Sequence, residues 1–278
     1  MLTVLHGSDF QYGKPYRPAV GSAFSRFAHA LEPDLVVVAG DLTQRARPSE
    51  FRGVRAVLDR LPDVPLVVTP GNHDVPLFRF WERLMDPYRN WRRFVDPAVD
   101  TVTTLDGATV VALSSAAPRR AVVAGHVSDA QVAWARERFA EAPDDHVRIL
   151  VTHHHFVATE DRLGGRPLQG GPRLLSAFES MGVDLILGGH VHQTHLTCTR
   201  AVVPCGEGRP GVPMLACGTT ASSRGRGVEA GRNTLNVIRI SDESVEVTPH
   251  EFEGQGDTFT ARPPRTFPRA ARVSGRGA

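Results

Sequence analysis

A chain of 278 residues is long enough to bury a full hydrophobic core without disulfide or metal staples. Its 41% hydrophobic and 22% charged residues are ordinary for a soluble enzyme, and a net charge of +2 gives no general preference for nucleic acid or a membrane surface. No apolar stretch approaches the roughly 18 to 20 residues that a membrane-spanning helix needs, and no secretory signal precedes the first apolar run.

Five short apolar runs recur along the first two thirds of the chain, and each ends in a cluster of polar residues or glycine. Short, unbroken runs rich in β-branched residues are typical of strands that are buried on both faces. The predicted strands cover residues 2–5, 35–39, 66–69, 149–152 and 185–187. Helical spacing between them predicts helices over residues 19–31, 49–61, 128–140 and 172–181. This alternation indicates βαβ units, a mainly parallel sheet and an α/β fold.

From Thr194 onward the pattern changes to strand after strand, which we interpret as antiparallel strands of a second sheet. These strands are predicted over residues 194–203, 214–216, 234–240 and 244–250. The end of the chain is rich in Pro, Arg and Gly and has no acidic residue after Asp257, as is typical of a flexible tail. We therefore expect one domain over residues 1–253 and a tail over residues 254–278.

The chain has three cysteines, Cys198, Cys205 and Cys217, and none of them forms a CxxC pair. A sparse, odd set of cysteines is typical of reduced thiols. We therefore expect a cytoplasmic protein.

Side chains that can bind metal gather directly after the five predicted strands. Because ligands of open α/β sheets lie beyond the carboxyl ends of the strands, we expect these side chains to converge. Turn chemistry explains one polar cluster, but not five in a row. Carboxylate and imidazole ligands together suit Mn, Fe or Zn, and one carboxylate can bridge two ions. The residues are Asp9, Gln11, Asp41, Asn72, His73, His153, His190 and His192.

These clusters form an ordered set of blocks: Asp9-Phe10-Gln11, Gly40-Asp41, Gly71-Asn72-His73-Asp74, His153 and Gly189-His190-Val191-His192. The set resembles the blocks D-x-H, G-D, G-N-H-[D/E], H and G-H-x-H of the calcineurin-like metallophosphoesterases, over about residues 2 to 195. Residues 40–44 (GDLTQ) and 125–128 (GHVS) make the chain most similar to the class III cyclic-nucleotide phosphodiesterase branch. The resemblance implies a four-layer αββα sandwich of two mixed β-sheets flanked by helices.

The resemblance also implies a role for each residue. One divalent metal ion would be held by Asp9, Gln11, Asp41 and His192. The other would be held by Asp41, Asn72, His153 and His190, with Asp41 shared. Two such ions lower the pKa of a bridging water, whose hydroxide attacks the phosphorus. Asp41 and Asn72 would serve catalysis together with His73, which would bind the substrate and either protonate the leaving alkoxide or orient the phosphate.

Two assignments leave alternatives open. Gln11 stands where the family pattern has histidine, and a carboxamide is a weaker ligand that favours Mn²⁺ over Fe or Zn. Alternatively, Gln11 does not bind metal and water takes its place. His153 directly follows a predicted strand and is favoured over His154 as the ligand. His154 would then either contact substrate or serve a structural role.

We expect hydrolysis of a small phosphodiester, with a cyclic nucleotide as the leading candidate. A DNA-processing nuclease of the same superfamily is an alternative, but it would need an extended basic groove for which this chain has little room. A non-catalytic scaffold with a decayed metal site is a second alternative, favoured only by Gln11. Nucleic acid and membranes are not expected partners, whereas the resemblance implies a homodimer or a larger assembly.

The segment over residues 76–94 follows the Asn72 block and combines aromatic residues with arginines. Aromatic rings beside arginines can form a lid that stacks on a nucleobase. An amphipathic helix that buries its rings is the alternative, and we favour it.

Overall fold

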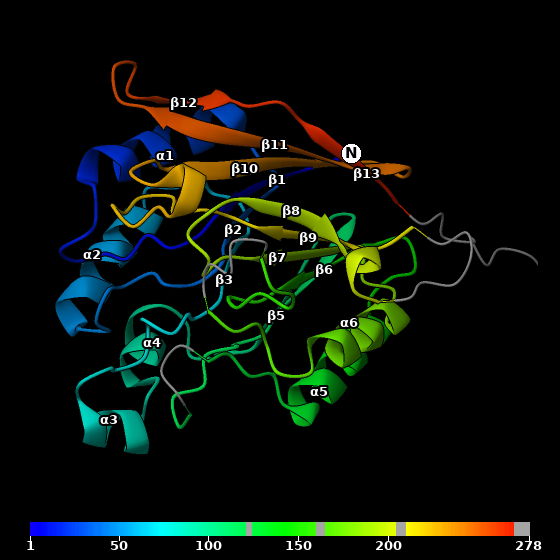
Figure 1. Ribbon diagram of the computed structural model, residues 1–278, viewed down its shortest axis with the longest axis horizontal. Coiled ribbons are helices and arrows are strands. Elements are labelled where there is room, and N and C mark those ends of the chain that lie inside the picture. The colour runs from blue at the N-terminus through cyan, green and yellow to red at the C-terminus, as the bar shows by residue number, and fades with distance from the viewer. Residues whose placement is uncertain (121–123, 160–164, 204–209, 270–278) are drawn as a thin grey trace, which may run out of the picture.

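Two β-sheets face each other, and helices cover their outer faces (Figure 1). The computed structural model describes residues 1–120, 124–159, 165–203 and 210–269. Each sheet combines parallel and antiparallel strands. The predicted four-layer αββα sandwich is therefore confirmed.

The first sheet carries the amino-terminal strands at its centre and one edge. Its parallel strands lie beside antiparallel strands from the end of the chain. The order across the sheet is β12 (Thr258–Ala261), β11 (Ser244–Glu253), β10 (Thr234–Ile240), β1 (Leu2–Gly7), β2 (Leu35–Val38) and β3 (Leu66–Val68), and β13 (Arg265–Pro268) also pairs with β11.

The second sheet is built around four parallel strands with an antiparallel strand at each edge. Its order is β4 (Thr101–Leu105), β5 (Ala108–Ala112), β6 (Val147–Val151), β7 (Leu185–Gly188), β9 (Pro213–Ala216) and β8 (His195–Cys198). The expectation that the late strands form this sheet by themselves was wrong, because β10 and β11 pair beside β1 in the first sheet.

The helices pack on the outer faces through apolar side chains. The first sheet is covered by α1 (Pro18–Leu31), α2 (Pro48–Leu58) and α4 (Arg89–Phe94), and the second by α5 (Asp129–Ala140) and α6 (Gly171–Ser180). Short helices lie at α3 (Phe80–Met85), η1 (Thr199–Ala201) and η2 (Gly227–Glu229). No helix in the described part of the chain is long and apolar enough to cross a bilayer.

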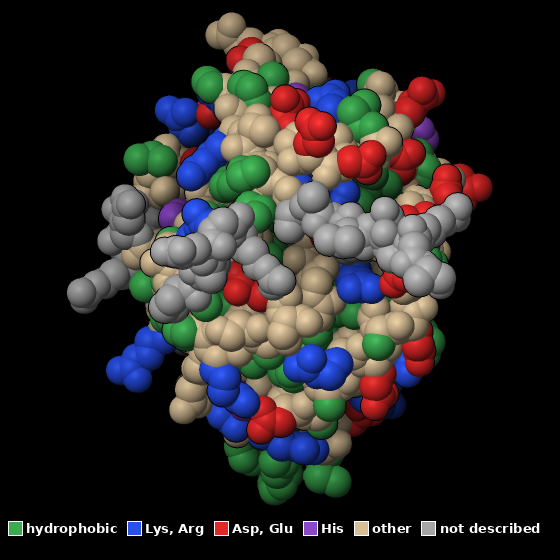
Figure 2. Space-filling model, turned by 90° about the vertical axis from the view of Figure 1, so that its right-hand side faces the viewer, with side chains coloured by type: hydrophobic (Ala, Val, Ile, Leu, Met, Phe, Trp, Pro, Cys, Tyr) green, Lys and Arg blue, Asp and Glu red, His purple; other side chains and the backbone are tan. Residues whose placement is uncertain are grey.

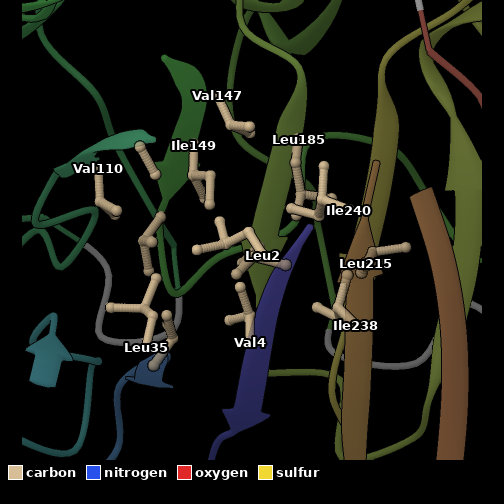
Figure 3. Close-up of a cluster of buried hydrophobic side chains, with 14 of the residues drawn as sticks. Leu2, Val4, Leu35, Val110, Val147, Ile149, Leu185, Leu215, Ile238 and Ile240 are labelled. Atoms are coloured by element: carbon tan, nitrogen blue, oxygen red, sulfur yellow. The ribbon is translucent and has the colours of Figure 1, made fainter. Parts of the chain in front are cut away.

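The inner core between the sheets is almost wholly aliphatic (Figure 3). Leu2 and Val4 of β1 meet Ile149 of β6 and Leu185 of β7 there, and all four side chains are buried. Strands buried on both faces explain why their sequences are unbroken apolar runs rather than alternating patterns. This core fixes how the carboxyl ends of the two sheets face each other.

The prediction of a flexible tail over residues 254–278 was wrong where two strands form. Residues 258–261 and 265–268 form β12 and β13, which pair with β11. Phe259 and Phe267 are buried, and the Phe259 ring packs against Phe27 and Phe252. Two buried aromatic rings outweigh the polar composition of this segment. Residues 270–278 lie outside the described part of the chain.

The strand predicted over residues 194–203 is shorter in the structure. β8 ends at Cys198, and a 3-10 turn follows over Thr199–Ala201. Cys198 is half-buried and Cys217 is fully buried, and both are free thiols. Cys205 lies outside the described residues.

The segment over residues 76–94 forms two short helices that differ in burial. Trp91 of α4 is buried, and its indole N–H donates to the carbonyl of Ala98. Phe78, Trp81 and Met85 on or beside α3 are each at least 74% exposed. Hydrophobic side chains also gather at the lower end of the surface in Figure 2, the end where Figure 1 places α3. The interpretation that this segment buries its rings therefore holds for α4 and fails for α3.

Candidate binuclear metal centre

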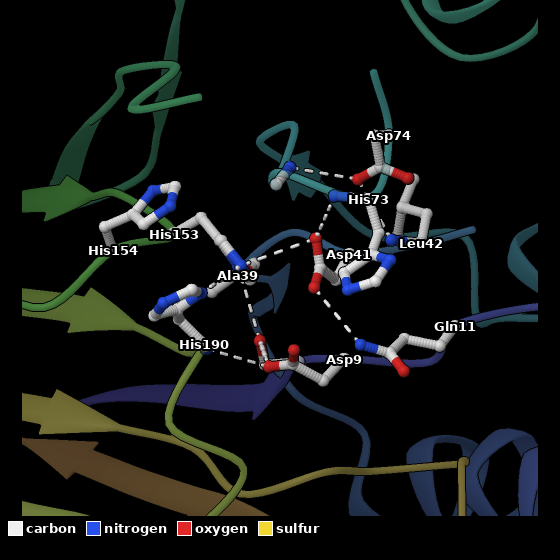
Figure 4. Close-up of polar contacts among 12 residues, drawn as sticks. Asp9, Gln11, Ala39, Asp41, Leu42, His73, Asp74, His153, His154 and His190 are labelled. Carbon is white, nitrogen blue, oxygen red and sulfur yellow. Dashed lines mark hydrogen bonds and ion pairs between the residues drawn. The ribbon is translucent and has the colours of Figure 1, made fainter. Parts of the chain in front are cut away.

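The predicted ligands converge at the seam between the two sheets (Figure 4). Asp9, Asp41 and Asn72 follow β1, β2 and β3 of the first sheet, whereas His153 and His190 follow β6 and β7 of the second. None of these five side chains is more than 6% exposed. The fold therefore brings polar groups from both sheets into one buried cluster.

The backbone at this cluster is strained. Eight non-glycine residues have a positive φ in the described chain, and five of them are the predicted ligands Asp9, Gln11, Asp41, His190 and His192. The left-handed region costs a non-glycine residue roughly 1–2 kcal/mol. Strain of this kind persists where the surrounding structure overrides it, and it clusters at ligand sites.

Glycines in the motifs permit close approach around the cluster. A Cβ on Gly40, whose φ is +86°, would lie 2.5 Å from Nδ1 of His153. A Cβ on Gly71 would lie 2.2 Å from Oδ1 of Asp41. Both glycines are therefore required by the packing of ligand side chains against the backbone.

Three groups form the centre of the cluster. Asp9, Asp41 and His153 each offer a ligand atom, and these atoms lie within 4.8 Å of one another. Nε2 of His153 is 3.4 Å from Oδ1 of Asp41, while its Nδ1 donates to the carbonyl of Ala39 at 2.7 Å. A backbone bond to Nδ1 is how proteins orient an imidazole that binds metal through Nε2. The preference for His153 as the ligand agrees with this geometry.

Several buried atoms around this centre lack hydrogen-bond partners. Oδ1 of Asp9, Oδ1 of Asn72 and Nδ1 of His192 are all unpaired in the described structure. The other oxygen of Asp9 accepts from the Ser8 hydroxyl and from the backbone N–H of His190. Buried polar atoms without partners are rare because they lose hydration without compensation. Their lone pairs fit divalent cations of the kind that carboxylate, carboxamide and imidazole groups bind.

Gln11 is buried in the cluster but presents its amide N–H₂. Nε2 lies 3.2 Å from Oδ2 of Asp41 and 3.5 Å from Nε2 of His192. Its Oε1 has no hydrogen-bond partner. The amide must turn by half a rotation before Oε1 can bind a cation, so metal binding by Gln11 stays a prediction.

Burial and mutual charge set the ionisation of the cluster. Burial raises the pKa of Asp9 to about 7. Burial also opposes ionisation of Asp41, but the positive charge of His153 and the hydrogen bonds from His153 and from the backbone N–H of His73 outweigh it and hold the pKa of Asp41 well below its usual range. The same attraction to Asp41 overcomes burial at His153 and raises its pKa to about 9. Positive charge is thus favoured beside Asp41 even without a metal ion.

His73 lies half-buried at the edge of the cluster. Its backbone N–H donates to Oδ1 of Asp41 at 2.8 Å, and Nδ1 lies 2.9 Å from the carbonyl of Gln44. Nε2 lies 3.2 Å from Nη1 of Arg224. A carbonyl only accepts and a guanidinium only donates, so Nδ1 carries the proton and Nε2 accepts. The predicted role as general acid requires Arg224 to leave Nε2 first.

Asp74 and His154 support the cluster from behind. The Asp74 carboxylate accepts from the backbone N–H groups of Leu42, Thr43 and Gly71, which ties the loops after β2 and β3 together. Nδ1 of His154 lies 2.9 Å from the Ser115 hydroxyl, and the side chain is 1% exposed. This burial favours the structural alternative for His154 over contact with substrate.

The cluster opens into a cavity of about 220 Å³. Its lining is Asp41, Asn72, His73, Gly165, His190, His192, Arg224 and Arg226. The two arginines were not predicted from the sequence. The sequence feature that could have indicated them is the polar stretch after the strand predicted over residues 214–216. We predicted that strand to be antiparallel, so its carboxyl end was not expected at the site. The structure shows β9 parallel to β7, so its carboxyl end faces the site.

A buried set of carboxylate, carboxamide and imidazole groups between the two sheets of an αββα sandwich has the ligand chemistry of a divalent metal centre. The chain belongs to the calcineurin-like phosphoesterase family, whose model matches residues 2–194. The predicted family is therefore confirmed, and with it the class of enzyme, a hydrolase of phosphoric esters.

Two curated relatives are phosphodiesterases by name, and the first agrees with the predicted cyclic-nucleotide branch of the family. The chain is 28% identical to a probable cyclic nucleotide phosphodiesterase from Rhodococcus erythropolis, over 78% of this chain and 70% of the relative. It is 27% identical to the glycerophosphodiester phosphodiesterase GpdQ from Enterobacter lignolyticus, over 59% of this chain and 58% of the relative. A dimetal phosphatase from Danio rerio shares the fold, with a TM-score of 0.64 and 11% identity over 97% of this chain and 99% of that structure.

Proposed function

We propose that the protein hydrolyses a phosphodiester bond of a small substrate, with a cyclic nucleotide as the leading candidate. The observation that carries the proposal is the close approach of ligand atoms from Asp9, Asp41 and His153, within 4.8 Å of one another and surrounded by unpaired buried acceptors. The relatives named as phosphodiesterases support this substrate class.

Two divalent cations, with Mn²⁺ favoured, complete the proposed site. Asp9, Gln11 and His192 would hold one cation, and Asn72, His153 and His190 the other, with Asp41 between them. When bound, such ions supply Lewis-acid charge and a water of lowered pKa.

The residues of the chain have separate tasks in this proposal. The negative charge of Asp41 holds the cationic partners together, and its bond to the backbone of His73 fixes the loop that carries Asn72 and His73. The His73 imidazole faces the same cavity and orients the phosphate. His73 can protonate the leaving oxygen only after Arg224 has released Nε2 and Nε2 has taken up a proton.

One observation favours a second candidate, a non-catalytic scaffold. The Gln11 amide N–H₂ lies next to Oδ2 of Asp41, where a shared carboxylate oxygen would otherwise face a cation. If Gln11 keeps this orientation, the first cation loses part of its ligand set. Measuring activity and metal content together distinguishes this candidate from the enzyme.

The test is hydrolysis of bis-p-nitrophenyl phosphate by metal-stripped protein titrated with Mn²⁺, alongside Asp41→Asn. We expect activity only with metal, and a loss of at least about a hundredfold in Asp41→Asn, because the shared ligand loses its charge. Asp129→Asn is the matched control, since its side chain is 81% exposed and distant in sequence from every predicted ligand. Wild-type protein that binds no Mn²⁺ and shows no turnover would instead support the scaffold.

A further inference from the structure

Two arginine side chains at the cavity have no carboxylate partner among the described residues. Arg224 and Arg226 are half-buried and line the same cavity as Asp41 and His73. The side-chain contacts of Arg224 are to neutral groups: His73 at 3.2 Å and Oε1 of Gln44 at 3.5 Å. Within the described chain, no acidic side chain lies within 4.0 Å of either guanidinium.

Among the other arginines of limited exposure, some have such partners, whereas Arg83 and Arg148 bond backbone carbonyls instead. The guanidinium of Arg269 bonds Asp184 at 3.0 Å, and Arg79 pairs with Glu82. Arg224 and Arg226 differ from both groups because they line one cavity together and form no ion pair within the described chain. Burial and the neighbouring charge of Arg226 both lower the pKa of Arg224, so the arrangement is costly until an anion joins it.

The loop that carries the pair is anchored on both sides. The backbone N–H of Ser223 donates to the carbonyl of Pro15 at 2.8 Å. The backbone N–H of Arg226 donates to the carbonyl of His192 at 2.9 Å, directly beside a predicted metal ligand. The guanidiniums are thus presented to the cavity by fixed backbone, as a preorganised binding site requires.

The charge of the cavity indicates which anion fits. Asp41 is the one carboxylate among the described lining residues, against the two guanidiniums of Arg224 and Arg226. A guanidinium fork matches the oxygens of a phosphate and binds them more strongly than it binds a neutral imidazole or amide. A phosphate oxygen therefore competes well for the Arg224 N–H that now bonds His73.

We propose that Arg224 and Arg226 bind a phosphate dianion, so that the preferred substrate carries more negative charge than a simple cyclic phosphodiester. This inference rests on the proposed function for the chemistry beside the pair, and it favours a phosphomonoester, or a diester that carries a second phosphate, over the cyclic nucleotide that leads that proposal. The dianion has two sources: the scissile group of a phosphomonoester, or a terminal phosphate next to a scissile diester. Binding draws Arg224 from His73 onto the phosphate, which releases Nε2 of His73.

The first test measures binding without turnover. Inorganic phosphate is titrated at pH 8 into Mn²⁺-loaded wild type, Arg224→Gln, Arg226→Gln and Arg224→Lys, and heat is recorded by calorimetry. We expect Arg224→Gln and Arg226→Gln to weaken phosphate binding about tenfold or more, and Arg224→Lys to weaken it less. The control is Arg173→Gln, whose side chain is 71% exposed. Equal phosphate affinity in all of these proteins would overturn the proposal.

The second test identifies the source of the dianion. Rates are compared for p-nitrophenyl phosphate against bis-p-nitrophenyl phosphate, and for thymidine 5′-(p-nitrophenyl phosphate) with and without a 3′-phosphate. We expect wild type to favour one dianionic member, and the arginine variants to lose about tenfold of that preference, mainly through KM. A preference for p-nitrophenyl phosphate assigns the dianion to the scissile group, and a preference for the 3′-phosphate assigns it to a terminal phosphate.

The two tests separate the inference from the proposed function. Phosphate binding that depends on the arginines, without hydrolysis of any of the four substrates, would retain the anion site and reject the proposed function. Hydrolysis with preferences that the arginine variants leave unchanged would retain the function and reject the anion site.

Discussion

Gln11 is the residue at which this chain departs from its family, and its environment explains how the departure is tolerated. The side chain is completely buried, and its amide donates toward Asp41 and lies beside His192. A neutral amide satisfies these neighbours in the absence of a cation. In the proposed site, a carboxamide at this position is a weaker ligand for the first cation than an imidazole would be.

Substitutions at Gln11 test this explanation. Gln11→His is expected to tighten binding of the weaker Mn²⁺ ion by about tenfold or more, because imidazole is the stronger ligand. Gln11→Ala is the informative companion: it weakens that ion only if the Gln11 carbonyl binds it. Isothermal titration of stripped protein gives both values, and unchanged affinity in Gln11→His would place residue 11 outside the coordination sphere.

The pKa values of Asp9 and His153 predict how metal binding depends on pH. In the metal-free protein these pKa values are raised to about 7 and about 9, so protons occupy both groups at lower pH. A metal ligand must be deprotonated, so each bound proton competes with the cation. Mn²⁺ affinity is therefore expected to rise from pH 6 to pH 9. Proton release is measured by titration in buffers with different heats of ionisation, and a flat profile would contradict the assignment.

At the scale of the elements, the residues that cap the start of α5 also bond to the loop that follows β5 of the second sheet. The Ser128 hydroxyl accepts from the backbone N–H of Gln131, and the Gln131 side chain accepts from the backbone N–H of Ser128. The same Gln131 amide donates to Asp100 and to the carbonyl of Ser114 in the loop after β5. One capping box thus fixes both the helix and the loop that follows a core strand.

Removing the cap is expected to destabilise the protein. Ser128→Ala loses the hydroxyl that accepts from the helix, so the free energy of unfolding should fall by about 1 kcal/mol. Urea denaturation monitored by circular dichroism measures the change. Ser176→Ala is the control, because that exposed hydroxyl bonds only within its own helix, to the carbonyl of Pro172. Equal midpoints for the two variants would argue against the cap.

The sequence predicted those parts of the structure that depend on local pattern. Each predicted ligand follows a short apolar run, so Asp9, Asp41 and His153 could be placed at strand ends before the fold was known. The division of strands between sheets depends on tertiary pairing, so the parallel position of β9, and with it Arg224, was missed. The burial of Phe259 in a polar segment likewise depends on a distant partner, Phe27.

At the scale of the whole molecule, the site joins the two sheets. Asp41 belongs to the first sheet and His153 to the second, and their side chains meet across the seam at 3.4 Å. A cation bound by both would add to the aliphatic core and to hydrogen bonds such as that from His153 to the carbonyl of Ala39, which already connect the two layers. Metal binding and the stability of the sandwich are therefore linked.

This linkage predicts thermal stabilisation by metal. A free Mn²⁺ concentration one hundred times the Kd is expected to stabilise the folded protein by about 2.7 kcal/mol and to raise Tm by several degrees. Differential scanning calorimetry of stripped and loaded protein measures the shift, and Asp41→Asn should lose most of it. A Tm that is independent of Mn²⁺ in wild type would show that no cation binds the native state in preference to the unfolded chain.

The left-handed backbone at Asp9, Gln11, Asp41, His190 and His192 has a consequence for engineering. Each of these residues holds its turn against its own conformational preference, and glycine would adopt the same turn without that cost. A library screened only for heat resistance should therefore be enriched in glycine at these positions. Its most stable members would be the ones that no longer turn over substrate, so thermal selection needs an activity screen beside it.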